Sequence, residues 1–168
     1  MAAETTVRQA VPADAGTVGQ LLHDFNAEFE SPSPDPETLS RRFGLLLPRT
    51  DVSVLLAERG DEVVGFASLT LRPTPYYEGP LAQLEELYVR PEVRGQGIGT
   101  RLLTDLVALV RRRGGGEIDI NVDESDVDAR RFYERHGFTN RELGSDYRML
   151  CYLRELGPDR TSTVWGTG

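Results

Sequence analysis

The sequence predicts a mixed α/β (α+β) fold, in which helices flank one twisted sheet. Three observations support this prediction. Apolar residues recur at helical spacing over residues 98–113, which is typical of an amphipathic helix. Two runs of strand length, 53–58 and 62–72, are joined by a turn at Arg59-Gly60-Asp61, which indicates a β-hairpin. Strands and helices are interspersed along 168 residues with neither repeats nor a long linker, so one mixed sheet is favoured.

The first half of the chain is expected to contain a strand, two helices and the hairpin. A short strand is predicted over 7–10, and Asp14 is a candidate N-cap for the helix after it. That helix is supported by apolar residues at helical spacing: Val18, Leu21, Leu22, Phe25 and Phe29. Prolines in the segment 31–36 fix φ and remove backbone donors, so the helix must end before them. A second helix is predicted over 36–46.

The second half is expected to alternate strands with helices. A loop at 73–80 precedes a strand over 81–89, and the long helix over 98–113 ends at three consecutive glycines. The remaining predicted elements are a strand at 117–122, a short helix at 126–135 and two late strands at 138–142 and 147–153. The sheet would then have six or seven strands, flanked by about four helices.

Composition excludes several classes of function. The net charge of −8 argues against a nucleic-acid partner, which requires a basic surface. The same charge is compatible with a cationic small-molecule substrate, although solubility explains it equally well. All 19 basic residues are arginine, so a Walker-type lysine and a Schiff-base lysine are excluded. His23, His136 and the single cysteine, Cys151, lack ligand-like spacing, so no metal site is predicted.

The chain also lacks the sequence signals of membrane insertion and secretion. No apolar run approaches the roughly 20 residues needed to span a bilayer. The N-terminus has no basic region followed by an apolar stretch. We therefore expect a cytoplasmic protein without a membrane partner. We also expect residues 1–157 to form a single domain and residues 158–168 to form a flexible tail.

The segment Arg94-Gly95-Gln96-Gly97-Ile98-Gly99 lies between a predicted strand and the long helix. Glycine lets the backbone approach a ligand closely, and the first N–H groups of a helix bind phosphate well. A Walker loop is excluded by the missing lysine, and the dinucleotide fingerprint fails because Thr100 or Leu102 would fill its last position. The segment therefore predicts a site for another phosphate ligand, with a ligand-free glycine-rich helix start as the alternative.

This segment matches Arg-x-x-Gly-x-Gly, the acetyl-CoA motif of the GCN5-related N-acetyltransferases (GNAT). Two further segments resemble the same family. Residues 84–94 are similar to its fourth strand and the exit from that strand, and residues 129–138 are similar to its "A…FYE…GF" segment. With the similar opening at residues 7–15, the resemblance covers residues 7–156. It implies a GNAT-like acyl-CoA N-acyltransferase fold and an acetyl-CoA-dependent N-acetyltransferase.

In this family the fourth and fifth strands splay apart around the pantetheine arm of the cofactor. The resemblance implies that the Leu87 N–H binds the thioester carbonyl and stabilises the charge that develops there. Asp126 stands where the family usually has asparagine. Aspartate lacks the amide donor with which an asparagine at this position would contact CoA. The implied cofactor-binding residues are Leu87, Tyr88, Val89, Arg94, Gly95, Gln96, Gly97, Ile98, Gly99, Thr100 and Asp126.

The resemblance also implies the residues that move protons. Tyr133 matches the tyrosine that protonates the departing CoA thiolate, with an aromatic core residue beside Phe132 as the alternative. Glu85 is the first choice for the base that deprotonates the amine, and Glu86 is the second. Adjacent strand residues face opposite sides unless a bulge intervenes, so one of these acids is alternatively a solvated strand residue.

The acceptor implied by the resemblance is a small cationic amine, such as a diamine, a polyamine or an aminoglycoside. The implied substrate-binding residues are Glu28, Glu30, Tyr77, Glu85 and Glu86. The alternatives are a protein N-terminal or side-chain acetyltransferase, and an acyl-CoA-binding module without catalysis. Because family members are often dimers, the resemblance also suggests a homodimer.

Overall fold

The computed structural model describes residues 4–154 and residue 156. The chain divides into two compact units, residues 1–120 and 121–168, and each is described by itself. The first unit contains β1 (Thr5–Gln9), α1 (Ala15–Glu28), α2 (Pro36–Leu46), β2 (Val52–Arg59), β3 (Glu62–Arg72), β4 (Leu81–Val89), α3 (Ile98–Arg112) and β5 (Ile118–Ile120). The second contains α4 (Val127–Arg135). The expected tail at 158–168 lies outside the described residues, and the single-domain expectation stays a prediction.

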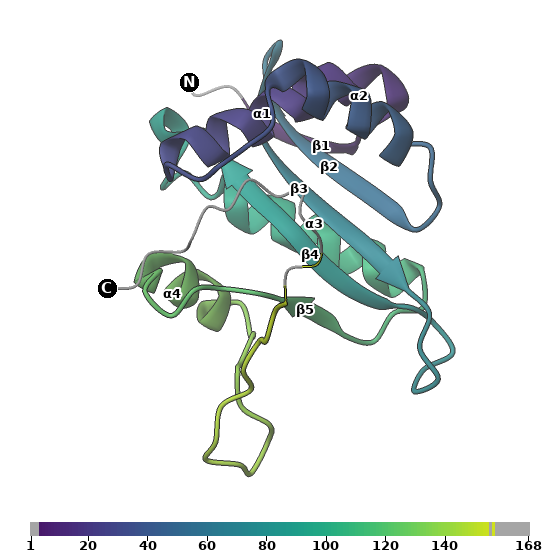
Figure 1. The fold of residues 1–168 in the computed structure, drawn as a ribbon, viewed down its shortest axis with the longest axis vertical. Helices are drawn as coiled ribbons and strands as arrows, with labels where there is room; N and C mark the ends of the chain where they lie inside the picture. The colour runs from purple at the N-terminus through teal and green to yellow at the C-terminus, as the bar shows by residue number, and fades with distance from the viewer. Residues whose placement is uncertain (1–3, 155, 157–168) are drawn as a thin grey trace. The chain divides into compact units, whose positions relative to one another are not determined.

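The five strands form one sheet in the order β1-β2-β3-β4-β5. The β1–β2, β2–β3 and β3–β4 pairs are antiparallel, and β5 runs parallel to β4 after the crossover through α3. Figure 1 shows α1 and α2 over one face of this sheet and α3 over the other. The predicted mixed α/β fold is therefore confirmed. Within the described residues the sheet has five strands, fewer than the six or seven expected.

The apolar core of the first unit lies on both faces of the sheet. Under α1 and α2 it contains Val18, Leu21, Phe43, Val54, Leu56, Phe66 and Tyr88. Side chains alternate along a strand, so Leu55 and Ala57 of β2 face the other side, where α3 buries Leu102 and Leu106. Because helices cover both faces, β2 reads as a nearly continuous apolar run instead of an alternating one.

Strand β4 contains a bulge at its two adjacent acids. Across the β3–β4 pair, Ser68 lies opposite Glu86 and Leu69 lies opposite Leu84, so Glu85 is an extra residue on β4. A bulge breaks the strict alternation of side chains. The two acids are therefore not held to opposite faces of a regular strand.

Strand β5 is much shorter than β4. Its three residues pair with Ala82, Gln83 and Leu84, whereas β4 continues to Val89. The β4–β5 pairing therefore ends before the two acids, and residues 85–89 of β4 extend beyond its parallel neighbour. The resemblance leads us to expect the pantetheine arm beside this part of β4, and that expectation stays a prediction.

The two late strands predicted at 138–142 and 147–153 are wrong. Among the described residues of the second unit, one backbone hydrogen bond joins these segments, from the Met149 N–H to the Asn140 carbonyl (2.6 Å). A strand needs a ladder of such bonds, and its apolar side chains need a face to cover. Most large side chains here are exposed: Tyr147, Met149, Leu150, Tyr152 and Leu153.

In the part of the chain that the structure describes, no helix is long and apolar enough to cross a membrane.

Candidate active site

The glycine loop joins the end of β4 to the start of α3. Gly95 and Gly97 have φ values of +72° and +80°, in the left-handed region that favours glycine. A Cβ atom at either position would meet nothing within 4 Å, so open space lies beside the loop. The Arg101 N–H donates to the Gly97 carbonyl (3.0 Å), which makes Gly97 the residue before the first helical turn. Two glycines in the left-handed region and a helix start beside open space fit a pyrophosphate group.

Arg59, at the end of β2, contacts this loop from two strands away in the sheet. Its Nη1 donates to Oε1 of Gln96 (2.7 Å), and its Nη2 donates to Oγ1 of Thr5 (3.3 Å). Its Nε is buried and has no partner among the described residues. Sequence reasoning missed Arg59, because nothing local in the hairpin indicates that β2 ends beside a loop 37 residues further along the chain.

Arg94 and Glu28 form a two-pronged ion pair. Nη1 and Nη2 of Arg94 donate to Oε1 and Oε2 of Glu28 at 2.6 and 2.7 Å. This hydrogen bonding holds the pKa of Glu28 below its usual range. Glu28 was expected among the substrate-binding acids. The structure places it on the arginine that begins the glycine loop, where its charge is already matched.

The two acids of β4 have different surroundings. The carboxylate of Glu85 is exposed and accepts a hydrogen bond from the Thr70 hydroxyl (2.5 Å). Glu86 is partly buried opposite Ser68, and no hydrogen bond or ion pair holds its carboxylate among the described residues. Desolvation, helped by the neighbouring charge of Glu85, raises the pKa of Glu86 to about 7. Glu86, our second choice from sequence, therefore has the properties of a base near neutral pH.

The cofactor-binding residues expected on β4 follow directly after Glu86. Leu87 pairs with Ala67 and Val89 pairs with Gly65 on the β3 side. Tyr88, between them, is buried in the core. The backbone of Leu87 and Val89 thus lies in the part of β4 that extends past β5. The Glu86 carboxylate, whose pKa is raised, lies on the same strand.

The other predicted substrate residues of the first unit lie in loops. Tyr77, before β4, donates a hydrogen bond from its hydroxyl to Oε2 of Glu117 (2.9 Å), which raises the pKa of Tyr77. Glu30 follows α1 in the left-handed region with a φ of +52°. Tyr77 precedes the start of β4, whereas the glycine loop follows its end. The hydrogen bond of Tyr77 thus links the β3–β4 loop to the segment before β5.

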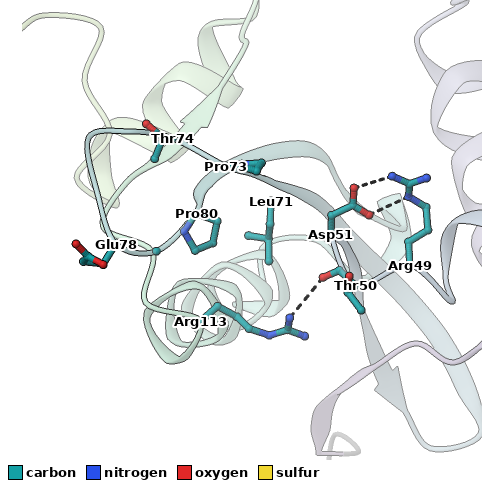
Figure 2. Close-up of a pocket in the computed structure, with 10 residues that line it drawn as sticks. Arg49, Thr50, Asp51, Leu71, Pro73, Thr74, Glu78, Pro80 and Arg113 are labelled. Atoms are coloured by element: carbon teal, nitrogen blue, oxygen red, sulfur yellow. Dashed lines mark hydrogen bonds and ion pairs between the residues drawn. The ribbon is translucent and has the colours of Figure 1, made fainter.

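A cavity of about 740 Å³ lies where β2 and β4 begin and β3 and α3 end. Figure 2 shows Arg49 paired with Asp51 at one side, Glu78 at the other and Arg113 directed at Thr50. Arg49 binds Asp51 at 2.6 and 2.8 Å, and Arg113 donates to the Thr50 carbonyl (3.4 Å). None of the predicted site residues lines it. Since α3 begins at the glycine loop and ends here, the length of that helix separates the two features.

In the second unit, Tyr133 is buried on α4. Its ring makes edge-to-face contacts with Phe132 and Phe138, with centroids 5.2 and 5.5 Å apart. Asp126 caps α4, because its Oδ1 accepts from the Ala129 N–H (2.9 Å). Its carboxylate therefore has the local role that an asparagine cap would have.

Within the described residues, no group of three or more His, Cys, Asp or Glu side chains is arranged to hold a metal ion.

Known proteins resemble this chain over most of its length. The model of the acetyltransferase (GNAT) family matches residues 18–138. An aminoglycoside N(6′)-acetyltransferase type 1 of Stenotrophomonas maltophilia is 33% identical over 154 residues, which is 89% of this chain and 95% of the relative. An aminoalkylphosphonate N-acetyltransferase of Salmonella typhimurium is 30% identical over 132 residues, covering 79% of this chain and 83% of the relative.

A solved structure supports the same fold. The crystal structure of a protein from Arthrobacter sp. FB24 has a TM-score of 0.84 and 52% sequence identity, and the match covers 90% of this chain and 96% of that one. Members of the matched family use acetyl-CoA as a co-substrate. The sequence resemblance, the glycine loop and the family match agree, and the chain belongs to the acetyltransferase (GNAT) family as an acetyl-transferring enzyme.

Proposed function

We propose that this enzyme transfers an acetyl group from acetyl-CoA to a primary amine of a small cationic molecule. The observation that carries the proposal is Glu86, a partly buried carboxylate with a pKa of about 7, directly before Leu87 on β4. An amine must lose a proton to form an amide, and a base acts best when its pKa lies near the working pH. Diamines, polyamines and aminoglycosides are the proposed acceptors, in line with the net charge of −8 and with the activity named for the S. maltophilia relative.

The glycine loop is the proposed holder of the cofactor. The backbone N–H groups from Arg94 to Thr100 would bind the pyrophosphate, and the backbone of Leu87 and Val89 would bind the pantetheine arm. Acetyl-CoA supplies the thioester whose acyl carbon the amine attacks. The Leu87 N–H would then donate to the oxygen on which negative charge develops.

The proposed proton transfers use one acid and one phenol. Glu86 takes the proton of the amine nitrogen as the new C–N bond forms. As the C–S bond breaks, its electron pair leaves with sulfur, and the resemblance to the family makes the Tyr133 hydroxyl the proposed proton donor to the thiolate. The products are the N-acetylated amine and CoA with a free thiol, and solvent returns the proton from Glu86 to the phenolate. Attack is direct, with both substrates bound together.

The proposal is tested by thiol release from acetyl-CoA with a panel of diamines, polyamines and aminoglycosides. Glu86→Gln should lower kcat/KM by about 10²- to 10⁴-fold, the usual contribution of a general base. Glu85→Gln is the matched control, because it removes the adjacent charge and should cost less than about tenfold. Full activity of Glu86→Gln would rule out this base. Absence of turnover with every amine, in protein that binds CoA, would support an acyl-CoA-binding module instead.

A further inference from the structure

The guanidinium of Arg94 is held by two elements of the first unit. Its two terminal nitrogens bind both oxygens of Glu28, the last residue of α1, and its Nε donates to the Val89 carbonyl at the end of β4 (2.8 Å). An arginine side chain has five N–H donors, and three of them are used here. The planar fork that suits arginine for binding a phosphate with two bonds is therefore already engaged by a carboxylate.

An aromatic stack holds the guanidinium from one side. The Arg94 guanidinium lies over the Tyr88 ring, 5.6 Å from its centroid. On α1, Phe25 stacks against the same ring at 5.2 Å and meets Phe29 edge to face at 5.3 Å. Tyr88 is only 5% exposed, so the stack is anchored in the core. Cation–π contacts of this kind favour one orientation of the arginine.

These contacts connect the end of α1 to the first residue of the glycine loop. The backbone of Arg94 enters the loop, while its side chain reaches back to α1, 66 residues earlier in the chain. We propose that the Arg94 side chain is a positioning group that holds the loop in its binding conformation through Glu28, and that contact with the cofactor phosphates is left to the loop backbone. This inference rests on the proposed function, because it assumes that the loop binds CoA.

The two roles of Arg94 predict opposite effects for Glu28. If Arg94 is a positioning group, removing the Glu28 charge releases its anchor, so the loop loses order and CoA binds more weakly. If Arg94 is itself a phosphate ligand, removing the competing carboxylate frees the guanidinium, so CoA binds more tightly. The sign of the change in affinity therefore separates the two roles.

We suggest titrating CoA calorimetrically into the wild type, Glu28→Gln, Arg94→Gln and the double variant. A positioning role predicts that each single change weakens binding by about 3- to 10-fold, and that the double variant is no weaker than Arg94→Gln, because residues acting as a pair are not additive. Arg49→Gln is the matched control, since Arg49 also forms a two-pronged ion pair but lies at the remote cavity. It should leave the affinity unchanged.

Arg94→Lys gives an independent readout. Lysine keeps the positive charge and binds phosphate, but it cannot form the two-pronged bond with Glu28. A positioning role predicts that Arg94→Lys resembles Arg94→Gln and raises KM for acetyl-CoA with little change in kcat. Tighter binding by Glu28→Gln, or near-normal affinity of Arg94→Lys, would overturn the inference alone. A wild type that binds no CoA would overturn the proposed function and the inference with it.

Discussion

The hydroxyl of Thr70 donates a 2.5 Å hydrogen bond to the carboxylate of Glu85, across the β3–β4 pair. This contact gives Glu85 a fixed partner on an exposed part of the strand. Its neighbour, Glu86, lies in a more buried position opposite Ser68, with a pKa raised to about 7. The bulge at Glu85 allows two adjacent acids to have such different surroundings.

The stability of the protein should depend on pH through Glu86. Its folded-state pKa of about 7 lies above the ordinary value of 4.5, so the folded state favours the protonated acid. Protonated Glu86 makes its full contribution to the free energy of unfolding below pH 4.5, and this contribution is lost as the pH rises through 7. Glu86→Gln removes the cost of the buried charge. It should be more stable than the wild type by on the order of 2 kcal/mol above pH 8 and equally stable near pH 4.

Urea unfolding at several pH values measures this difference. Glu85→Gln serves as a control, because it removes the exposed carboxylate of the same bulge and should give at most a small gain in stability. A stability difference for Glu86→Gln that does not change between pH 4 and pH 8 would contradict the assigned pKa.

The rate of acetyl transfer should rise with pH through the same range. A base must be ionised to accept a proton, so Glu86 is inactive well below its pKa of about 7 and active above it. We expect kcat/KM of the wild type to increase between pH 6 and pH 8, and we expect Glu86→Gln to lose this limb. The measurement is a pH–rate profile with an amine that titrates well above this range. The same limb in Glu86→Gln would assign it to another group.

Gly97→Ala should weaken CoA binding. Gly97 has a φ of +80°, so alanine there is strained by about 1–2 kcal/mol although its Cβ would meet no atom within 4 Å. The added methyl would occupy the open space beside the loop, and we expect affinity for CoA to fall at least tenfold, roughly the loss of one to two phosphate contacts.

Gly114→Ala is the matched control for this loss. Gly114 has a φ of +79° and lies at the opposite end of the same helix, where a Cβ would make only an ordinary contact at 3.6 Å. It should cost similar stability and leave CoA affinity intact when both variants are titrated. Equal affinity of the two variants would show that the loop is not the phosphate site.

Tyr133→Phe should distinguish between two roles of Tyr133, a catalytic proton donor and a residue that only packs in the core. The ring of Tyr133 packs against Phe132 and Phe138, and phenylalanine preserves this packing while removing the hydroxyl. If Tyr133 protonates the thiolate, kcat should fall about 10²-fold or more with little change in melting temperature. Tyr147→Phe, at an exposed position of the same unit, should have no effect. Unchanged turnover of Tyr133→Phe would remove Tyr133 from the mechanism.

Gly79→Ala should destabilise the first unit, because the added methyl group would clash with a neighbouring backbone segment. A Cβ on Gly79 would lie 1.9 Å from the backbone oxygen of Gly114, so the loop before β4 and the end of α3 would have to separate. We expect a loss of about 1–3 kcal/mol in the free energy of unfolding, as for other overpacked sites. Gly44→Ala, in α2 with no atom within 4 Å, should instead stabilise the protein slightly. Thermal melts of both variants check the contrast.

Much of the fold could be predicted because its elements are encoded by local patterns. The helix over 36–46 and the hairpin strand over 62–72 have the bounds expected from proline, glycine and apolar spacing. The strand at 117–122 was predicted to be longer than the observed β5, Ile118–Ile120. The late strands failed for a related reason: a strand exists only where a neighbour supplies its ladder, and local propensity does not supply that neighbour.

The sequence by itself determined the glycine loop, the order of the helices and strands in the first unit, and the presence of two acids on β4. These follow from backbone permissiveness and from periodicity, which act over a few residues. Only the tertiary structure decided that Glu86 has a raised pKa, and that Glu28 is paired with Arg94. Desolvation and ion pairing depend on which distant segments come together, and that information appears only when the sheet and its helices have packed.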